Sequence, residues 1–164
     1  MAPAPLSPYD SAVSSRPYDE IARVLGPTGT RDERMEAVVD ALWQGLRETG
    51  VTWVGFYVDK PGEPDEERLV LGPCKDKLAC SPIGLHGVCG QVVRVRQPRI
   101  VDDCTRLGAD HIACDPSDRS EIAVPLLDDT GCCWGVLDLD SHELGAFDES
   151  DEAGLRRVLA AAGL

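Results

Sequence analysis

The spacing of hydrophobic and polar positions predicts an amphipathic helix over residues 30–50. Thr30 and Glu33 have the spacing of a capping box, and Gly50 lies where the C-terminal cap of a helix belongs. Between these signals, apolar side chains recur at helical spacing: Met35, Val38, Val39, Leu42 and Leu46. One face of this helix is therefore expected to pack on a core.

Other segments have the period and composition of β-strands. Residues 51–58 (VTWVGFYV) and 68–71 predict one antiparallel hairpin, and residues 121–127 and 132–139, which flank the turn Asp128–Gly131, predict a second. The remaining predicted elements are helices at 17–25 and 88–96, a brief strand at 99–101, and a last helix that begins at Asp148. The order ααββ, α, β, ββα predicts an α+β domain with helices packed on an antiparallel sheet.

Long loops at residues 72–87 and 102–120 interrupt this order. Loops of this length in so short a chain are commonly functional. Before the first helix, residues 1–16 are rich in Pro and Ser and are predicted to be a tail, which leaves residues 17–164 as a single domain.

Length and charge narrow the classes of function. A chain of 164 residues is long enough for one domain with its own core. Its 16 Lys and Arg against 29 Asp and Glu give a net charge of −13, which repels phosphate backbones and anionic lipid. No run reaches the ~18 apolar residues of a membrane span, and the amino terminus lacks a signal-peptide pattern. Neither nucleic acid nor a membrane is expected as a partner.

The cysteines indicate a reducing compartment. There are 7 of them, an odd number that cannot all pair internally, so reduced thiols in a cytoplasm are expected. No pair has the C-x-x-C spacing that zinc sites favour, and no metal is expected. Four cysteines are assigned structural positions: Cys74, Cys104, Cys132 and Cys133.

Cys80, Cys89 and Cys114 lie in or beside the long loops, where thiols can be reached. Cys89 begins a predicted helix, whose dipole would lower the pKa of its thiol. Cys114 follows His111, which can accept a proton, and precedes Asp115, an anion that would raise the thiol pKa. These residues alone leave open which thiol reacts, or whether each is a small buried hydrophobe.

Acidic and aromatic side chains are predicted to share faces of the sheet. Asp138 and Asp140 alternate on one strand, and Glu121 lies on its hairpin partner. Such carboxylates repel one another unless they meet a cation, such as a ligand amine, or face solvent at a strand end. Trp53 and Tyr57 also share a face, where they pack in a core or line a cavity.

An ordered set of short segments carries a resemblance to a known family. They are WVGFY (53–57), LGP (71–73), AC (79–80), GVCG (87–90), HIACD (111–115), SEI (120–122) and GVLDLDS (135–141). On these segments, from about residue 17 to the carboxyl end, the chain resembles the GAF-domain free methionine-R-sulfoxide reductases. The resemblance implies a GAF fold, with a central antiparallel sheet and helices on both sides, and usually a homodimer.

The resemblance also implies roles for individual residues. It makes Cys114 the nucleophile and Cys80 the resolving thiol, with Cys89 the third redox cysteine and the alternative nucleophile. The acids that hold the substrate match Glu121, Asp138 and Asp140, and the wall around its methyl group matches Trp53 and Tyr57.

Two departures from the family pattern bear on the disulfide between Cys80 and Cys114. The segment from Cys80 to Cys89 is one residue shorter than the pattern, and the turn between the two hairpin strands is one residue longer. We expect Gly84 and Gly87 to absorb the shortening through backbone angles closed to other residues, so that the disulfide still forms.

The implied reaction needs no bound cofactor. A thiolate attacks the sulfoxide sulfur, and a neutral carboxyl of Glu121 or Asp138 protonates the oxygen. The resulting sulfenic acid condenses with a second thiol, and thioredoxin, supplied by NADPH, reduces the disulfide. Free rather than peptide-bound substrate is expected, because only a free amino acid brings an ammonium to the acids. Its carboxylate is expected to meet backbone donors around residues 110–117.

Two other classes of function remain open. The same acidic pocket can serve a non-catalytic GAF sensor that binds a small amine or an amino acid, although sensors usually carry an output domain for which 164 residues leave little room. A redox-sensing interaction protein that uses the cysteines is the third reading.

Overall fold

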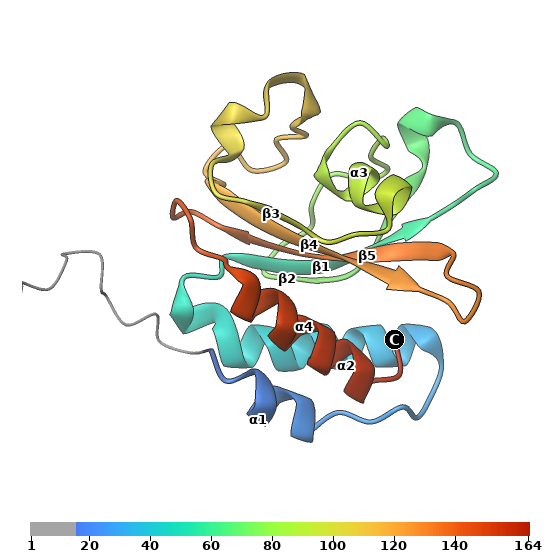
Figure 1. Cartoon of the computed structure of the whole chain (residues 1–164), viewed down its shortest axis with the longest axis vertical. Helices are drawn as coiled ribbons and strands as arrows, with labels where there is room; N and C mark the ends of the chain where they lie inside the picture. Colours follow the sequence, from blue (N-terminus) through green and yellow to red (C-terminus); the bar gives the residue numbers. More distant parts are fainter. Residues whose placement is uncertain (1–15) are drawn as a thin grey trace, which may run out of the picture.

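The computed structural model describes residues 16–164. Its sheet has 5 strands in the order β2-β1-β5-β4-β3, and every neighbouring pair is antiparallel. The strands are β1 Trp53–Asp59, β2 Leu69–Lys75, β3 Arg99–Val101, β4 Ser120–Leu127 and β5 Cys133–Ser141. The helices are α1 Tyr18–Arg23, α2 Arg31–Leu46, α3 Val88–Val95 and α4 Glu149–Ala161. Figure 1 shows α1, α2 and α4 on one side of the sheet and α3 with the long loops on the other, as predicted.

Helix α2 begins and ends where the sequence predicts. The Thr30 hydroxyl accepts a hydrogen bond from the Glu33 backbone at 3.2 Å, and the Glu33 carboxylate accepts one from the Thr30 backbone at 2.7 Å. At the other end the α-helix gives way to a 3-10 turn at Arg47–Thr49, and Gly50 caps it with φ of 91°. This left-handed conformation is the one that favours glycine.

Strand β2 is longer than predicted, because it continues past Leu71 to Lys75. Gly72 and Pro73 suggested a loop, but β2 lies at the edge of the sheet, where a missing proline N–H costs no interstrand hydrogen bond. The register against β1 shifts between Gly55 and Tyr57, which accommodates the irregular backbone.

Separate apolar clusters cover the two faces of the sheet. The cluster beneath α2 and α4 includes Phe56, Leu137 and Leu155, which are fully buried. The cluster on the α3 side includes Trp53 and Tyr57 from β1. The predicted site therefore lies on the α3 face.

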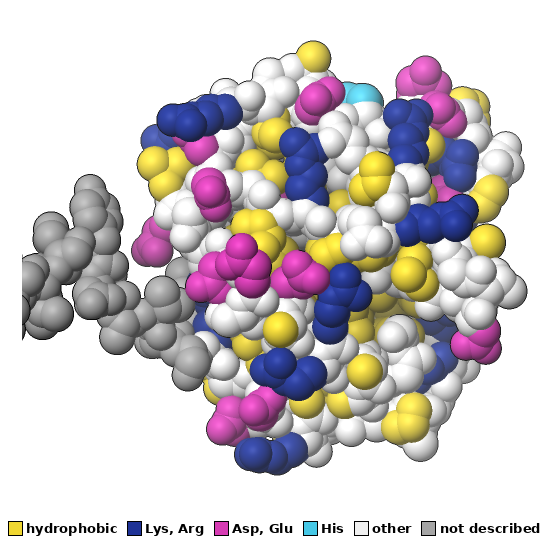
Figure 2. Space-filling model, viewed as in Figure 1, with side chains coloured by type: hydrophobic (Ala, Val, Ile, Leu, Met, Phe, Trp, Pro, Cys, Tyr) yellow, Lys and Arg dark blue, Asp and Glu magenta, His cyan; other side chains and the backbone are white. Residues whose placement is uncertain are grey.

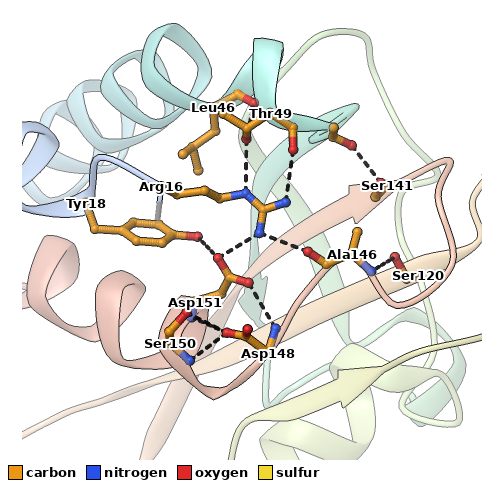
Figure 3. Close-up of polar contacts among 11 residues, drawn as sticks. Arg16, Tyr18, Leu46, Thr49, Ser120, Ser141, Ala146, Asp148, Ser150 and Asp151 are labelled. Atoms are coloured by element: carbon orange, nitrogen blue, oxygen red, sulfur yellow. Dashed lines mark hydrogen bonds and ion pairs between the residues drawn. The ribbon is translucent and has the colours of Figure 1, made fainter. Parts of the chain in front are cut away.

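Arg16 is packed against the domain although it falls within the predicted tail. Its guanidinium donates to the Asp151 carboxylate at 2.7 Å and to the Ala146 carbonyl at 2.9 Å, and the Tyr18 hydroxyl donates to the same carboxylate (Figure 3). Burial and the Asp151 carboxylate raise the pKa of Tyr18. The rest of that tail, residues 1–15, lies outside the described residues.

Surface charge is mixed on the face that Figure 2 presents, where Lys and Arg side chains are interspersed with Asp and Glu. The net negative charge is therefore not gathered on that face. Across residues 16–164, no helix has both the length and the apolar composition needed to span a membrane.

Candidate active site

A cavity opens on the α3 face, between the strands and the long loops. It contains about 480 Å³ of space, including its opening to solvent. The predicted site residues that line it are Trp53, Tyr57, Cys89, Cys114, Glu121, Asp138 and Asp140. Cys80 is not in the lining, but it is bonded to Cys114 at the wall. The structure thus brings together the residues that the sequence analysis selected.

Strand register places the three predicted acids on one face. Glu121 pairs with Asp140 across β4 and β5, and Asp138 lies two residues before Asp140. The Glu121 and Asp138 side chains are buried, with 7% and 6% of the residue surface exposed. Asp138 Oδ1 has no hydrogen-bond partner within residues 16–164. A buried oxygen without a partner is unfavourable, which makes it available to a ligand.

Burial changes the protonation of these acids. It raises the pKa of Glu121 to about 7, and the negative charge of Asp118 adds to the effect. The pKa values of Asp138 and Asp140 are raised well above the usual range, first by burial and then by the charge of Glu121. At neutral pH, Asp138 and Asp140 therefore tend to hold their protons when no cation lies beside them.

The raised pKa of Glu121 predicts a pH-dependent gain in stability for Glu121→Gln. The folded protein binds this proton more tightly than the unfolded chain, so the wild type loses stability as pH rises from about 4.5 to about 7. The Gln variant lacks this loss. We expect the variant to be more stable by up to about 3 kcal/mol at pH 8 and equal to wild type near pH 4.

Urea unfolding of the substrate-free protein at both pH values measures this difference. Glu63→Gln, at an exposed position, serves as the control for loss of one negative charge. If the free energies of unfolding of wild type and Glu121→Gln differ by the same amount at both pH values, Glu121 is not the group with the raised pKa.

Cys89 does not have the lowered thiol pKa that its place at a helix start suggested. Its side chain is buried, with 4% exposed, and burial together with the charges of Asp138 and Glu121 raises the thiol pKa well above the usual value. The helix dipole contributes less than about 1 kcal/mol at most exposed termini, whereas full burial shifts a pKa by several units. The Cys89 thiol is therefore protonated at neutral pH.

Cys80 and Cys114 form a disulfide in the structure, with their Cα atoms 5.5 Å apart. The expected pairing is thus present despite the shortened segment. The expected reason was wrong, because neither Gly84 nor Gly87 has a positive φ. These glycines provide space instead: a Cβ at Gly87 would lie 2.7 Å from the Ile112 side chain, and one at Gly84 would lie 2.8 Å from the His86 ring.

The aromatic residues of β1 hold the Cys80 loop over the cavity. The Tyr57 hydroxyl donates to the Cys80 carbonyl at 2.9 Å, and the Trp53 indole N–H donates to the Lys77 carbonyl at 2.8 Å. Their ring centroids are 6.2 Å apart. The rings therefore have a positioning role in addition to forming the cavity wall. In the sequence, Gly55 lies between Trp53 and Tyr57, and a Cβ at this position would collide with the Trp53 ring.

The sequence analysis considered Asp115 only beside Cys114 and missed the side chains that lie near it at the cavity mouth. The Lys77 ammonium pairs with the Asp115 carboxylate, which joins the two long loops beside the disulfide. His142 Nε2 lies 3.6 Å from Asp115 Oδ2 and 3.6 Å from Asp118 Oδ1. Asp118 lines the cavity. Loop residues have no periodic pattern from which their direction could be predicted, and only Asp118 had a signal, its nearness to Cys114 in sequence.

Among residues 16–164, two groups bring potential metal-ligand atoms within 4.8 Å of one another. The first consists of Cys89, Glu121 and Asp138, whose raised pKa values mean that a metal ion would have to displace their protons. In the second, Asp115, Asp118 and His142, the first carboxylate is already paired with Lys77. The donor sets suit proton transfer and ion pairing better than a resident metal.

Comparison with known proteins finds similarity over most of the chain. The GAF domain model matches residues 28–164. The free methionine-R-sulfoxide reductase of Saccharomyces cerevisiae is 36% identical over 120 residues, which are 71% of this chain and 65% of that protein. The Escherichia coli protein of the same name is 40% identical over 116 residues, 70% of this chain and 66% of that protein. The matches thus span slightly less than two thirds of these relatives.

A solved structure is similar over a larger share of its length. The free methionine-R-sulfoxide reductase from Neisseria meningitidis, solved in complex with its substrate, has a TM-score of 0.74 and 34% identity. The similarity covers 99% of this chain and 98% of that one.

Proposed function

Because this chain belongs to the GAF domain family, we propose that its cavity binds free L-methionine-(R)-S-oxide and that its thiols reduce it to methionine. The observation that carries the proposal is the Cys80–Cys114 pair, which closes a disulfide at the wall of a cavity that also contains buried acids. A binding module needs no such pair. The similarity to free methionine-R-sulfoxide reductases supports the same function.

The proposed reaction transfers the sulfoxide oxygen to a thiol. The Cys114 thiolate attacks the sulfoxide sulfur while a carboxylic acid protonates the oxygen. The S–O bond breaks, the methionine thioether leaves, and Cys114 carries the oxygen as a sulfenic acid. The Cys80 thiol then displaces this oxygen as water and forms the disulfide. The two thiols have together given two electrons to the sulfoxide.

Asp138 is the better candidate for the proton donor. A general acid must hold its proton near neutral pH, and burial raises the pKa of Asp138 well above the usual value, whereas it raises that of Glu121 only to about 7. Glu121 and Asp140 then remain to hold the substrate ammonium, whose positive charge lowers the pKa of a neighbouring carboxyl and favours its ionised form. Asp140 is partly exposed in the cavity and lies opposite Trp53 on β1, which suits contact with an amine beside an aromatic wall.

The acids also favour a free amino acid over a residue within a peptide. Ionised carboxylates in a buried cluster repel one another, and only a cation relieves this repulsion. A peptide-bound methionine sulfoxide has no α-ammonium. It would leave the acids protonated or unpaired, so its binding lacks the favourable attraction between carboxylates and an ammonium.

The proposal includes an external reductant and a homodimer in the cytoplasm. Cys80 and Cys114 are exposed residues, so a thiol from another protein can reach the disulfide. Thioredoxin, reduced by NADPH, is the reductant that the family resemblance implies. No cofactor bound to the domain itself is part of the mechanism.

Thioredoxin-dependent oxidation of NADPH tests the proposed function. We expect turnover with free methionine-(R)-S-oxide, and a value of kcat/KM lower by about 100-fold or more for the S isomer and for a peptide that contains the R sulfoxide, because each loses charge-assisted or shape contacts. Equal rates for free and peptide substrates would contradict the role of the acids. Binding of methionine without any turnover would favour a sensor.

A further inference from the structure

We propose that Asp118 is a specificity-determining residue that, together with Asp140, receives the α-ammonium of the free amino acid. This inference rests on the proposed function and adds a fourth carboxyl to the acids of the cavity. Asp118 follows Cys114 by four residues in the loop between β3 and β4. It lines the cavity with Asp140, and the same two residues, together with Lys77, line an adjoining cleft.

The Asp118 carboxylate is mostly buried and lacks a hydrogen bond. Its side chain is only 12% exposed. Within the described part of the chain, its oxygens accept no hydrogen bond, and His142 Nε2 lies 3.6 Å from Oδ1. A carboxylate removed from water in this way is unfavourable unless a charged donor completes its contacts. A ligand ammonium in the cavity would supply that donor.

The groups around Asp118 favour an arriving cation. Burial of Asp118 raises its pKa to about 6, and the negative charge of Asp115 in the same loop adds to this rise, while His142 and Lys77 act in the opposite direction. On the sheet side, the charge of Asp118 raises the pKa values of Glu121 and Asp140. Asp118 is thus ionised at pH 8, faces further carboxyls, and has the half-exposed His142 ring rather than a paired Lys or Arg beside it.

The basic side chains near Asp118 both contact Asp115 as well. The Lys77 ammonium is paired with Asp115 rather than with Asp118. His142 is 47% exposed and lies between Asp115 and Asp118, so it contacts both from the solvent side. Neither Lys77 nor His142 is part of the lining of the cavity that Asp118 shares with Asp140. An α-ammonium between Asp118 and Asp140 would therefore pair with one carboxylate from the loop and one from β5. An uncharged peptide nitrogen cannot do this.

Substrate selectivity of Asp118→Asn tests this inference. We compare kcat/KM for free methionine-(R)-S-oxide with that for its N-acetyl derivative, which has no ammonium. The preference is the ratio of kcat/KM for the free form to kcat/KM for the N-acetyl form. At pH 8 this ratio is expected to be about tenfold lower in the variant than in wild type, since a contact between charged partners is replaced by one in which the side chain is neutral. The difference between wild type and variant should shrink toward pH 5, where Asp118 is protonated in the wild type.

Asp129→Asn is the matched control, because it removes the same charge at an exposed turn position. Thermal unfolding of both variants checks that they fold, and Asp118→Ser provides a second variant without a carboxylate. Calorimetric binding of free L-methionine, with N-acetylmethionine for comparison, measures ammonium recognition without turnover. Weaker methionine binding by Asp118→Asn would support the inference even if wild type shows no reductase activity. An unchanged preference in both measurements, while wild type turns over, would overturn the inference and leave the proposed function standing.

Discussion

Replacing Cys114 by serine is expected to lower reductase turnover by about 10³-fold or more, because a hydroxyl at neutral pH is a far weaker nucleophile than a thiolate. The change removes one sulfur atom from an exposed residue, so the fold should be retained. Turnover is measured with free methionine-(R)-S-oxide and an excess of thioredoxin. Binding of methionine by the variant shows that the cavity is intact.

Cys132→Ser is the control for Cys114→Ser, because it changes another exposed cysteine, outside the cavity lining, in the same way. It should turn over substrate like wild type. Retention of more than a tenth of the activity by Cys114→Ser would transfer the nucleophilic role to Cys89. The buried, protonated state of the Cys89 thiol argues against that outcome.

Replacing Cys80 by serine is expected to stop catalysis after a single turnover. Cys114 can still attack the sulfoxide, so the variant should release about one methionine per chain. The sulfenic acid then has no partner thiol, and thioredoxin-dependent turnover should fall by about 10²-fold or more because the disulfide that thioredoxin reduces is not formed. Rapid-quench measurement of methionine gives the burst, and a sulfenic-acid reagent followed by peptide mapping locates the oxidised sulfur.

The oxidised cysteine in this variant distinguishes two mechanisms. A trapped sulfenic acid on Cys114 supports the assigned order of events. A new disulfide between Cys89 and Cys114, with continued turnover, would mean that Cys89 acts as the resolving thiol. Full turnover without any disulfide would contradict the role of Cys80.

Much of the sheet and its acidic face could be predicted because both follow simple periods. Side chains alternate along a strand, so Asp138 and Asp140 had to share a face, and the antiparallel hairpin brought Glu121 opposite Asp140. The extra residue in the hairpin changed none of this, since the register shift lies between Leu126 and Leu127, beyond the acids.

Properties that depend on long-range packing could not be predicted. The sequence showed that Cys89 begins a helix, but not that the helix buries this thiol against Asp138, and burial outweighs the helix dipole. It also suggested unusual backbone angles at Gly87, whereas the structure requires space for Ile112 from the other loop. Asp118 was overlooked because the direction of a loop side chain is set by contacts with residues distant in sequence, here His142.

A single-turnover experiment on the wild type tests the central claim most directly. The protein is fully reduced, freed of reductant, and mixed with excess free methionine-(R)-S-oxide, and both methionine and the remaining thiols are counted. The account predicts about one methionine per chain and a disulfide that peptide mapping locates between Cys80 and Cys114. No release of methionine, with both thiols still open to alkylation, would contradict the claim that this cavity reduces methionine sulfoxide.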